Sequence, residues 1–309
     1  MHEHIARAMY YFSVHLMFAS VVALASWGLT SILRASATTK YWLWVATVFN
    51  FVLPFAALVD KLWAPHLTWA RPLGAIGVPV WNLTQGRTAV IVGLAWAAGA
   101  LFMLRRLVSR IRREHRQAIA PAPEDRGRPS DFLVDGIPVD SGHKYAPPAV
   151  HGLLHPRILL PAGLERLLNS REFEAVLIHE AAHARRRDNL IRLVYETSLC
   201  ALWFHPLMWL AGTRIGLYRE LSCDESVIRR GHGQELISAL AKLAVPEHVK
   251  VLQATASSHL SYRLACLAAA PQTTQRGASV LLAAVFAGVV VASVFQTVAH
   301  TACCFLLKP

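Results

Sequence analysis

Four stretches of the chain contain no Asp, Glu, Lys or Arg and are long, or nearly long, enough to cross a lipid bilayer. A spanning helix needs about 20 apolar residues, because the hydrocarbon layer is about 30 Å thick and a helix rises about 1.5 Å per residue. The stretches predict four transmembrane helices, at about 8–33, 41–59, 88–106 and 277–299. A cleaved signal peptide, with ALA at 23–25 as its cleavage site, is the alternative interpretation of the first stretch.

The composition agrees with a membrane protein. Hydrophobic residues make up 54% of the chain and charged residues only 16%, whereas about a quarter of the residues in an ordinary soluble domain are charged. Lys and Arg number 31 against 19 Asp and Glu, an excess that could also indicate nucleic-acid binding. Six of the arginines, however, gather between 105 and 116, where the third stretch ends. We therefore predict the lipid bilayer as a partner and no direct binding of nucleic acid.

The arginine cluster also predicts the orientation of the chain. It places the end of the third span in the cytoplasm, so residues 1–108 would hold three spans with the loop at 61–87 outside. A cytoplasmic domain would follow at 109–276, then the fourth span and a short extracytoplasmic tail at 300–309. This topology predicts a multi-pass membrane protein with its central domain on the cytoplasmic side.

The predicted cytoplasmic domain begins with a Pro-rich polar linker at 118–131. In DFLVDGIPVD, the pair Asp135-Gly136 lies between two β-prone triplets and predicts a hairpin, and Pro138 would confine its strand to a sheet edge. The stretch GLLHPRILLP also predicts an edge strand. A helix should follow, with Asn169 or Ser170 as its cap and glutamates in its first turn.

The sequence HEAAH, at 179–183, indicates metal chemistry. Residues four apart on a helix lie on one face, so His179 and His183 can both direct an imidazole nitrogen at one Zn²⁺ ion. Glu180 lies beside the first of them, where it can take a proton from water and later pass it to a leaving amine. Two histidines on a helix face that binds no metal are the alternative. The five cysteines form no CxxC pair and are odd in number, so they indicate neither disulfides nor a cysteine zinc site.

A catalytic zinc site needs three protein ligands and an open position. Downstream, RELSCDES supplies Glu220 and Asp224, again four apart. We predict that Glu220 completes the site and that Asp224 accepts a hydrogen bond from the far nitrogen of a ligand histidine. Without HEAAH, such an acidic pair would indicate only a solvated helix face. His205 is a competing third ligand, although a His-Pro pair in an apolar run more often marks a helix break.

The segment from Thr197 to Thr213 is uncharged and could pass for a fifth span. If it crossed the bilayer once, Glu220 would lie on the opposite side from His179 and His183, and the three could not share an ion. We therefore expect a helical pair broken near Pro206, a re-entrant segment or an interfacial helix. We favour a broken helix packed between the zinc domain and the bilayer.

Together, the order of the spans and the stretches HPRILLP, VLIHEAAHARRRDN, FHPLMWLA and RELSCDESV resemble the BlaR/MecR antirepressor family of membrane metallopeptidases. The resemblance covers most of the chain and implies a gluzincin-type enzyme with zinc ligands His179, His183 and Glu220, a catalytic Glu180 and a supporting Asp224. It implies a mostly α protein of the bacterial cytoplasmic (inner) membrane, with its active site on the cytoplasmic side. In such a protein a cytoplasmic α+β zinc metallopeptidase domain is inserted between the third and fourth of four transmembrane helices.

The β-lactam-sensing members of that family carry a penicillin-binding domain with an SxxK serine after the fourth span, whereas almost nothing follows that span here. The one SxxK sequence, Ser141 to Lys144, falls in the predicted cytoplasmic domain, and we interpret it as a coincidence. A β-lactam receptor is therefore not predicted.

The resemblance implies a zinc endopeptidase with one Zn²⁺ ion that acts in signal transduction. Its substrate would be a cytoplasmic protein, either a transcriptional repressor of the winged-helix type or the protein itself, with a homodimer as one candidate assembly. An extended substrate could pair with the sheet edge predicted near 151–160. Two alternatives stay open: a membrane quality-control peptidase of the HtpX kind, and a non-proteolytic transducer in which zinc is structural.

Overall fold

The computed structural model describes residues 2–52, 86–119, 129–143, 147–244 and 256–269, together with 277, 279–284, 287 and 288. Its helices are α1 (His2–Ile32), α2 (Ala37–Val52), α5 (Gly86–Ile119), α6 (Leu164–Leu167), α7 (Ser170–Arg186), α8 (Asp188–Ala201), α9 (Pro206–Arg229), α10 (Gly233–Leu243) and α11 (Ala256–Ala268). The described strands are β1 (Pro129–Val134), β2 (Ile137–His143), β3 (Ala149–His151) and β4 (Arg157–Pro161), and they form one sheet. The described part is mostly helical with a small sheet, as predicted.

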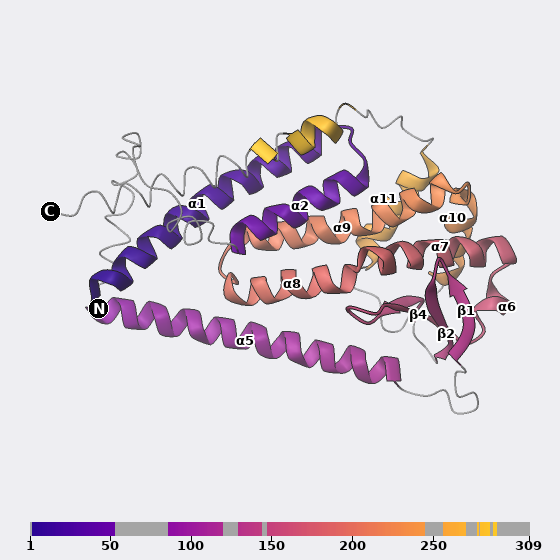
Figure 1. The fold of residues 1–309 in the computed structure, drawn as a ribbon, viewed down its shortest axis with the longest axis horizontal. Coiled ribbons are helices and arrows are strands. Elements are labelled where there is room, and N and C mark those ends of the chain that lie inside the picture. Colours follow the sequence, from indigo (N-terminus) through magenta and orange to yellow (C-terminus); the bar gives the residue numbers. More distant parts are fainter. Residues whose placement is uncertain are drawn as a thin grey trace.

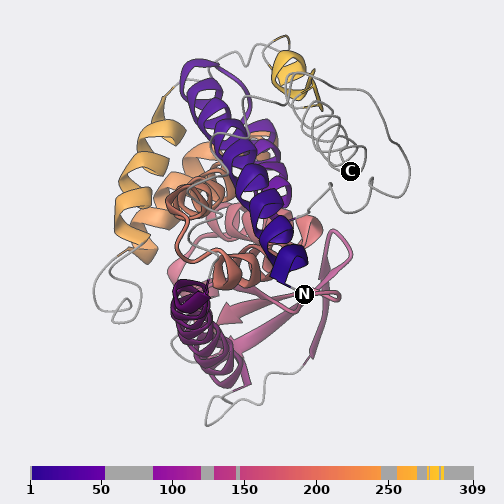
Figure 2. The same ribbon diagram turned by 90° about the vertical axis from the view of Figure 1, so that its left-hand side faces the viewer.

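The long helices extend along the molecule, and the sheet lies at one end of it (Figure 1). α1 and α2 form a hairpin that packs on α9, while α5 runs along the opposite side and contacts α8. The sheet lies below α1 and α2 in both views (Figure 2). α7 contacts both the sheet and α9, so it joins the two parts of the molecule.

Two described helical segments are long and apolar enough to cross a membrane, His15–Ile32 of α1 and Val90–Arg116 of α5. α5 is continuous to Ile119, so residue 108, the predicted end of the membrane region, lies inside a helix. The second predicted span coincides with α2 as far as Val52. Its remainder, most of the predicted fourth span and residues 120–128 of the predicted linker lie outside the described residues.

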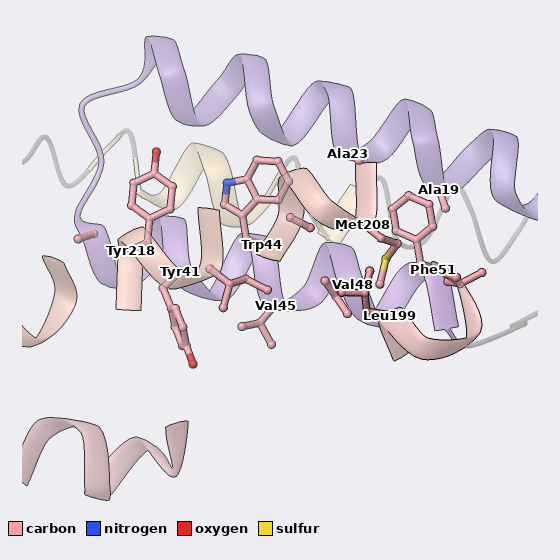
Figure 3. Close-up of a cluster of buried hydrophobic side chains, with 14 residues drawn as sticks. Ala19, Ala23, Tyr41, Trp44, Val45, Val48, Phe51, Leu199, Met208 and Tyr218 are labelled. Atoms are coloured by element: carbon pink, nitrogen blue, oxygen red, sulfur yellow. The ribbon is translucent and has the colours of Figure 1, made fainter. Parts of the chain in front are cut away.

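The core of the helical part is formed by α1, α2, α8 and α9 (Figure 3). Tyr41, Trp44 and Met208 are completely buried in it. Ala19 and Ala23, which are also completely buried, lie four apart on α1 and leave room for neighbouring helices to approach closely. Between helices surrounded by lipid, such close packing replaces the release of water as the main source of attraction.

The uncharged segment from Thr197 to Thr213 forms a helical hairpin. α8 ends at Ala201 and α9 begins at Pro206, whose fixed φ and missing N–H suit the first turn of a helix. The predicted break near Pro206 is therefore confirmed. Because the chain reverses direction there, the beginning of α8 and the second half of α9 lie at the same end of the hairpin (Figure 1).

The tip of this hairpin is tied to α5. Trp203 lies so close to Gly99 that a Cβ at that position would collide with the indole ring. The Trp203 Nε1 donates a hydrogen bond to the carbonyl of Trp96 at 3.2 Å, and the Trp96 Nε1 donates to the carbonyl of Ala201 at 2.9 Å. These reciprocal bonds hold the tip against the apolar part of α5.

The hairpin predicted at Asp135-Gly136 is confirmed. The two residues have φ values of 51° and 79°, and β1 pairs antiparallel with β2, as expected for a two-residue turn of this type. The predicted edge position of the strand with Pro138 is wrong, because the strand order is β1-β2-β4-β3. The pairing of β2 with β4 begins at Val139, so the missing N–H of Pro138 falls outside that ladder.

The second predicted edge strand also occupies a different place. The RILLP residues form β4, which pairs in parallel with β2 on one side and antiparallel with β3 on the other. β4 is therefore an inner strand, and the short β3 forms the edge. The prediction failed because strand order depends on pairing partners that are distant in the chain.

Candidate metal centre

α7 carries the HEAAH residues and begins at a well-formed cap. The Asn169 side chain accepts a hydrogen bond from the Glu172 N–H, and the Glu172 carboxylate accepts one from the Asn169 N–H, both at 2.9 Å. This capping box confirms the predicted helix start. Hydrogen bonds from Lys242 and then Ser238 of α10 contribute most to lowering the pKa of Glu172 to about 2. The helix start is therefore anchored to α10.

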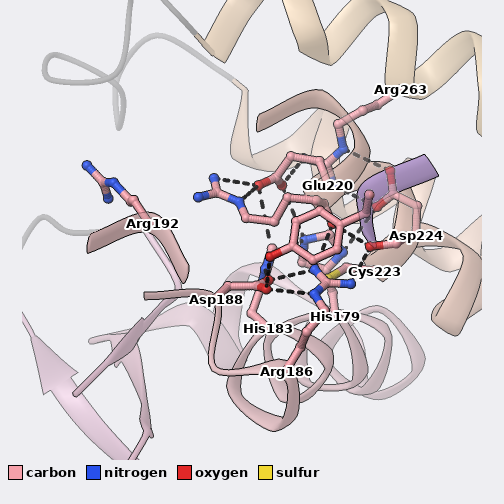
Figure 4. A network of polar contacts seen from close by, with 12 residues as sticks. His179, His183, Arg186, Asp188, Arg192, Glu220, Cys223, Asp224 and Arg263 are labelled. Carbon is pink, nitrogen blue, oxygen red and sulfur yellow. Dashed lines mark hydrogen bonds and ion pairs between the residues drawn. The ribbon is translucent and has the colours of Figure 1, made fainter. Parts of the chain in front are cut away.

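His179 and His183 of α7 converge with Glu220 of α9 (Figure 4). The His179 Nε2 lies 3.2 Å from the His183 Nε2 and 3.5 Å from Glu220 Oε2, and the His183 Nε2 lies 3.8 Å from Glu220 Oε1. Ligand atoms arranged tetrahedrally about 2.0–2.1 Å from a zinc ion would be roughly 3.3 Å apart. The three side chains therefore fit a zinc ion with only small adjustments.

Each of the two histidines contacts a buried carboxylate through its other ring nitrogen. Asp224 Oδ1 lies 3.1 Å from the His179 Nδ1, within ion-pair distance but without the geometry of the hydrogen bond expected of Asp224. Asp188 Oδ2 lies 2.6 Å from the His183 Nδ1. Carboxylates in this position fix the tautomer and the orientation of a ligand histidine.

Asp188 is missing from the predicted site, although it follows the motif closely in the sequence HARRRDN. It lies past the end of α7, where Arg187 adopts a left-handed φ of 55° and turns the chain into α8. Helical spacing from His183 therefore does not point to it. The short distance from the motif to an Asp that can begin the next helix is the only sequence signal.

Arg263 of α11 is a second residue that the sequence did not indicate. It donates hydrogen bonds to both carboxylate oxygens of Asp224, at 2.9 and 2.7 Å, and to Glu220 Oε2 at 3.1 Å. Its side chain is only 11% exposed. Arg263 lies 43 residues after Glu220, and no spacing rule connects an arginine on one helix with acids on another.

Two further arginines balance the remaining acidic groups. Arg186 donates to both oxygens of Asp188, at 2.6 Å each. Arg219 donates to Glu220 Oε1 at 2.8 and 3.1 Å. Asp224, Glu220 and Asp188 are thus all paired with arginines, as charges removed from water must be.

The electrostatic field of the centre favours a positive charge between the histidines. Burial lowers the pKa of His179, but its contacts with Asp224 and Glu220 outweigh this effect and raise the pKa to about 9. Burial raises the pKa of Glu220, yet His183 and His179 hold it well below its usual range. The field that stabilises a proton on the histidines would equally stabilise a metal cation, so the donor set fits a metal ion.

Glu180 differs from the other acids of the centre. It is 9% exposed, and its carboxylate has no hydrogen-bond or ion-pair partner among the described residues. Glu220, Asp224 and Asp188 are each held by at least one arginine. Glu180 is therefore the acid of this group whose oxygens are available for proton transfer.

A second group with metal-binding geometry consists of His183, Asp188 and Cys223. It shares His183 with the first group and so belongs to the same centre. Cys223 is completely buried, and its Sγ accepts a hydrogen bond from Arg186 at 3.2 Å. The first group is the better candidate, because it leaves the His183 Nδ1 in contact with Asp188.

His205, the competing third ligand, does not take part in either group. It precedes α9 at the hairpin tip, where its Nε2 lies 3.1 Å from Ser20 Oγ and its ring packs edge-on against Phe51. Ser141 of the SxxK sequence lies in β2, and Lys144 lies outside the described residues.

Comparison with known proteins gives one family and a few relatives. A family model described as BlaR1 peptidase M56 matches residues 11–267. Regulatory protein BlaR1 of Bacillus licheniformis is 32% identical over 82 residues, and the methicillin resistance mecR1 proteins of Staphylococcus aureus and Staphylococcus epidermidis are 28% identical over 82 residues. Each of these matches covers 26% of this chain and 14% of the relative, so the aligned part is a small share of the relatives' length.

Proposed function

Because the chain belongs to the BlaR1 peptidase M56 family, we propose that this membrane-associated metallopeptidase is a zinc endopeptidase that cleaves a cytoplasmic protein during signalling. One observation carries the proposal. His179, His183 and Glu220 converge, and Glu180, which follows His179 on α7, has a carboxylate with no partner among the described residues. A structural metal site has no need of such an acid, whereas hydrolysis of a peptide bond requires a base.

In this proposal His179, His183 and Glu220 hold one Zn²⁺ ion. When bound, zinc supplies Lewis-acid activation of water and of a peptide carbonyl. Glu180 takes the proton from the attacking water onto a carboxylate oxygen and returns it to the leaving amine. Asp188 accepts from the Nδ1–H of His183, and Asp224, 3.1 Å from the His179 Nδ1, would accept from that nitrogen after a small adjustment. Both carboxylates would then keep the Nε2 lone pairs directed into the centre.

We further propose that the centre faces the cytoplasm. The arginine-rich end of α5 is linked to α8 by two ion pairs: Arg110 with Glu196, and Arg192 with Glu114 at 2.9 Å. α8 begins at Asp188, beside the metal centre. Because arginines gather on the cytoplasmic side of spans, the linkage supports a cytoplasmic position for the centre.

The same geometry supports a re-entrant hairpin. The tip formed by α8 and α9 lies against Trp96 and Gly99, in the apolar part of α5. Phe204 and Trp209 of the tip region are 44% and 45% exposed, which is unfavourable in water but not in lipid. We propose that the hairpin enters the bilayer from the cytoplasmic side and returns, with its backbone groups satisfied by the two helices.

The substrate would meet the enzyme at β3, the edge strand that contacts α7. Backbone pairing with an edge strand presents an extended peptide to a helix-borne metal. The Asn189 Nδ2 already donates to the carbonyls of Val150 and Gly152, at 2.8 and 3.3 Å, so a pairing substrate would have to displace it there. A transcriptional repressor or a second segment of this chain would suit this site if the cleaved bond lies in an extended segment.

The test compares the wild-type protein with Glu180→Gln in reconstituted membranes. We expect the variant to bind stoichiometric zinc and to lose at least about 100-fold in cleavage of a cytoplasmic repressor or of the chain itself, as for removal of a general base. Glu174→Gln, on the exposed face of the same helix, is the control and should cleave normally. Equal cleavage by the wild-type protein and by Glu180→Gln would refute the proposal that this protein is an enzyme. Zinc binding by the wild-type protein without any cleavage would favour a structural role for the metal ion.

A further inference from the structure

Tyr41, near the start of α2, is connected to the metal centre through a single residue. Its ring is completely buried, and its hydroxyl donates a hydrogen bond to Asp188 Oδ1 at 2.9 Å. The other oxygen of that carboxylate lies 2.6 Å from the His183 Nδ1. Tyr41 is the first residue of the predicted second span. The helix predicted to form this span, α2, therefore contacts Asp188, the carboxylate beside the candidate metal ligand His183.

Tyr41 is held firmly in this position. The guanidinium of Arg186, which forks onto both oxygens of Asp188, also lies over the Tyr41 ring, 4.3 Å from its centroid. Asp188 is 4% exposed, so solvent offers no ready substitute for a lost donor. Removing the Tyr41 hydroxyl would leave the arginine as the main donor to Asp188 Oδ1.

The axial position of α2 is set from the helix that carries Glu220. Glu225 of α9 accepts hydrogen bonds from the backbone N–H of Ala37 at 2.6 Å and of Thr38 at 3.4 Å, and from the Thr38 hydroxyl at 3.3 Å. A carboxylate at a helix N-terminus satisfies free N–H groups and interacts favourably with the helix dipole. Tyr41 lies one turn further on, so its hydroxyl cannot leave Asp188 by a slide of α2 without breaking the contacts of Glu225.

We infer that Tyr41 is a positioning residue for the metal centre, because through Asp188 it orients His183. The position of α2, the helix of the predicted second span, then influences the affinity of the centre for its metal ion. This inference rests on the proposed zinc site. It makes α2 a coupling element, because a displacement of this helix that breaks the contact between Tyr41 and Asp188 weakens the hold on the metal. The alternative role of the hydroxyl, satisfying a buried carboxylate without influence on the metal, predicts a change in stability only.

The first experiment measures zinc affinity by competition with a chromogenic chelator, using the full chain in detergent micelles. Removing the direct partner of a ligand histidine costs about 10- to 100-fold in affinity, so Tyr41→Phe, one bond further away, should cost roughly 3- to 10-fold. The matched control is Tyr195→Phe, which removes a hydroxyl that donates to the carbonyl of Met208 at 3.3 Å in the same hydrophobic cluster. The control should leave zinc affinity unchanged, and an equal loss in both variants, or in neither, would overturn the inference.

A second experiment separates positioning from general destabilisation. In the Asp188→Asn background the carboxylate through which Tyr41 acts is gone, so Tyr41→Phe should cause no further loss of zinc affinity. An effect of the hydroxyl on zinc affinity that does not pass through Asp188 predicts instead that the two losses add. The absorption spectrum of the Co²⁺-substituted protein gives a second readout, which should shift in Tyr41→Phe and not in Tyr195→Phe. If the wild-type protein binds no stoichiometric zinc, the proposed function fails. If the wild-type protein binds zinc and Tyr41→Phe binds it with the same affinity, only this inference is refuted.

Discussion

The metal centre has two halves, one around His179 and one around His183, and each half places a carboxylate against its histidine in a different way. His179 lies against Asp224, which is on the helix of Glu220 and is held by Arg263 of α11. His183 is oriented by Asp188, which lies just past the end of its own helix and is held by Arg186 and by Tyr41 of α2. Equivalent carboxylates can thus come from helical spacing or from a chain reversal.

The two halves also depend on different parts of the chain. The Asp224 half is completed from α11, the described helix that precedes the predicted fourth span. The Asp188 half is completed from α2, which coincides with the predicted second span. A displacement of α11 should therefore affect the surroundings of His179, and a displacement of α2 should affect those of His183.

The largest expected effect tests the dependence of the Asp224 half on α11. Arg263→Gln leaves the buried Asp224 and the partly buried Glu220 without their shared partner. Breaking a buried ion pair costs about 3–5 kcal/mol. We expect a loss of this size in the free energy of unfolding of the metal-free protein, measured by denaturant titration. The control is Arg157→Gln, because Arg157 also forks onto an aspartate, Asp140, but its side chain is 43% exposed.

Exposed pairs of that kind contribute about 0–1 kcal/mol. If Arg263→Gln were no more destabilising than Arg157→Gln, α11 would not stabilise the Asp224 half. The proposed dependence of that half on α11 would then be wrong.

A smaller effect tests whether the halves are equivalent at the metal. Asp188→Asn and Asp224→Asn should each weaken zinc binding about 10- to 100-fold, since each removes the carboxylate that orients one ligand histidine. Asp140→Asn, which alters an aspartate of β2 that is paired with Arg157 of β4, should leave the affinity unchanged. Chelator competition at fixed pH measures all three, and a loss confined to one of the two site variants would show that only one histidine needs its carboxylate.

The smallest effect concerns Glu172, which supports the two histidines alike because it caps the helix that carries both. Its pKa is lowered to about 2 from a usual 4.5, so its stabilising contribution is complete above about pH 5 and is lost as the pH falls toward 2. Glu172→Gln should therefore lower the thermal midpoint at pH 6, and its difference from wild type should shrink as the pH approaches 2. Glu174→Gln, with a side chain 60% exposed, should show no such trend, and a difference for Glu172→Gln that does not change with pH would contradict the role of its charge.

Much of the local structure could be predicted from the sequence, because it depends on neighbours in the chain. Spacing by four brought His179 and His183 onto one face of α7, and Glu220 and Asp224 onto one face of α9. Capping chemistry narrowed the start of α7 to Asn169 or Ser170, and the structure has Asn169 as the cap. The sheet shows the limit of such reasoning: Pro138 correctly indicated a missing donor, but only the pairing of β2 with β4 decided that this donor was not needed.

By itself, the sequence determined that α7 carries His179, Glu180 and His183 and that the chain turns near Pro206. Both features follow from the stereochemistry of a short segment. Only the tertiary structure decided that Asp188 orients His183 and that Tyr41, 147 residues earlier, and Arg263 complete the surroundings of the metal centre. The physical reason is that a hydrogen bond between distant segments depends on how whole helices pack, and helix packing depends on all their contacts together rather than on any local pattern.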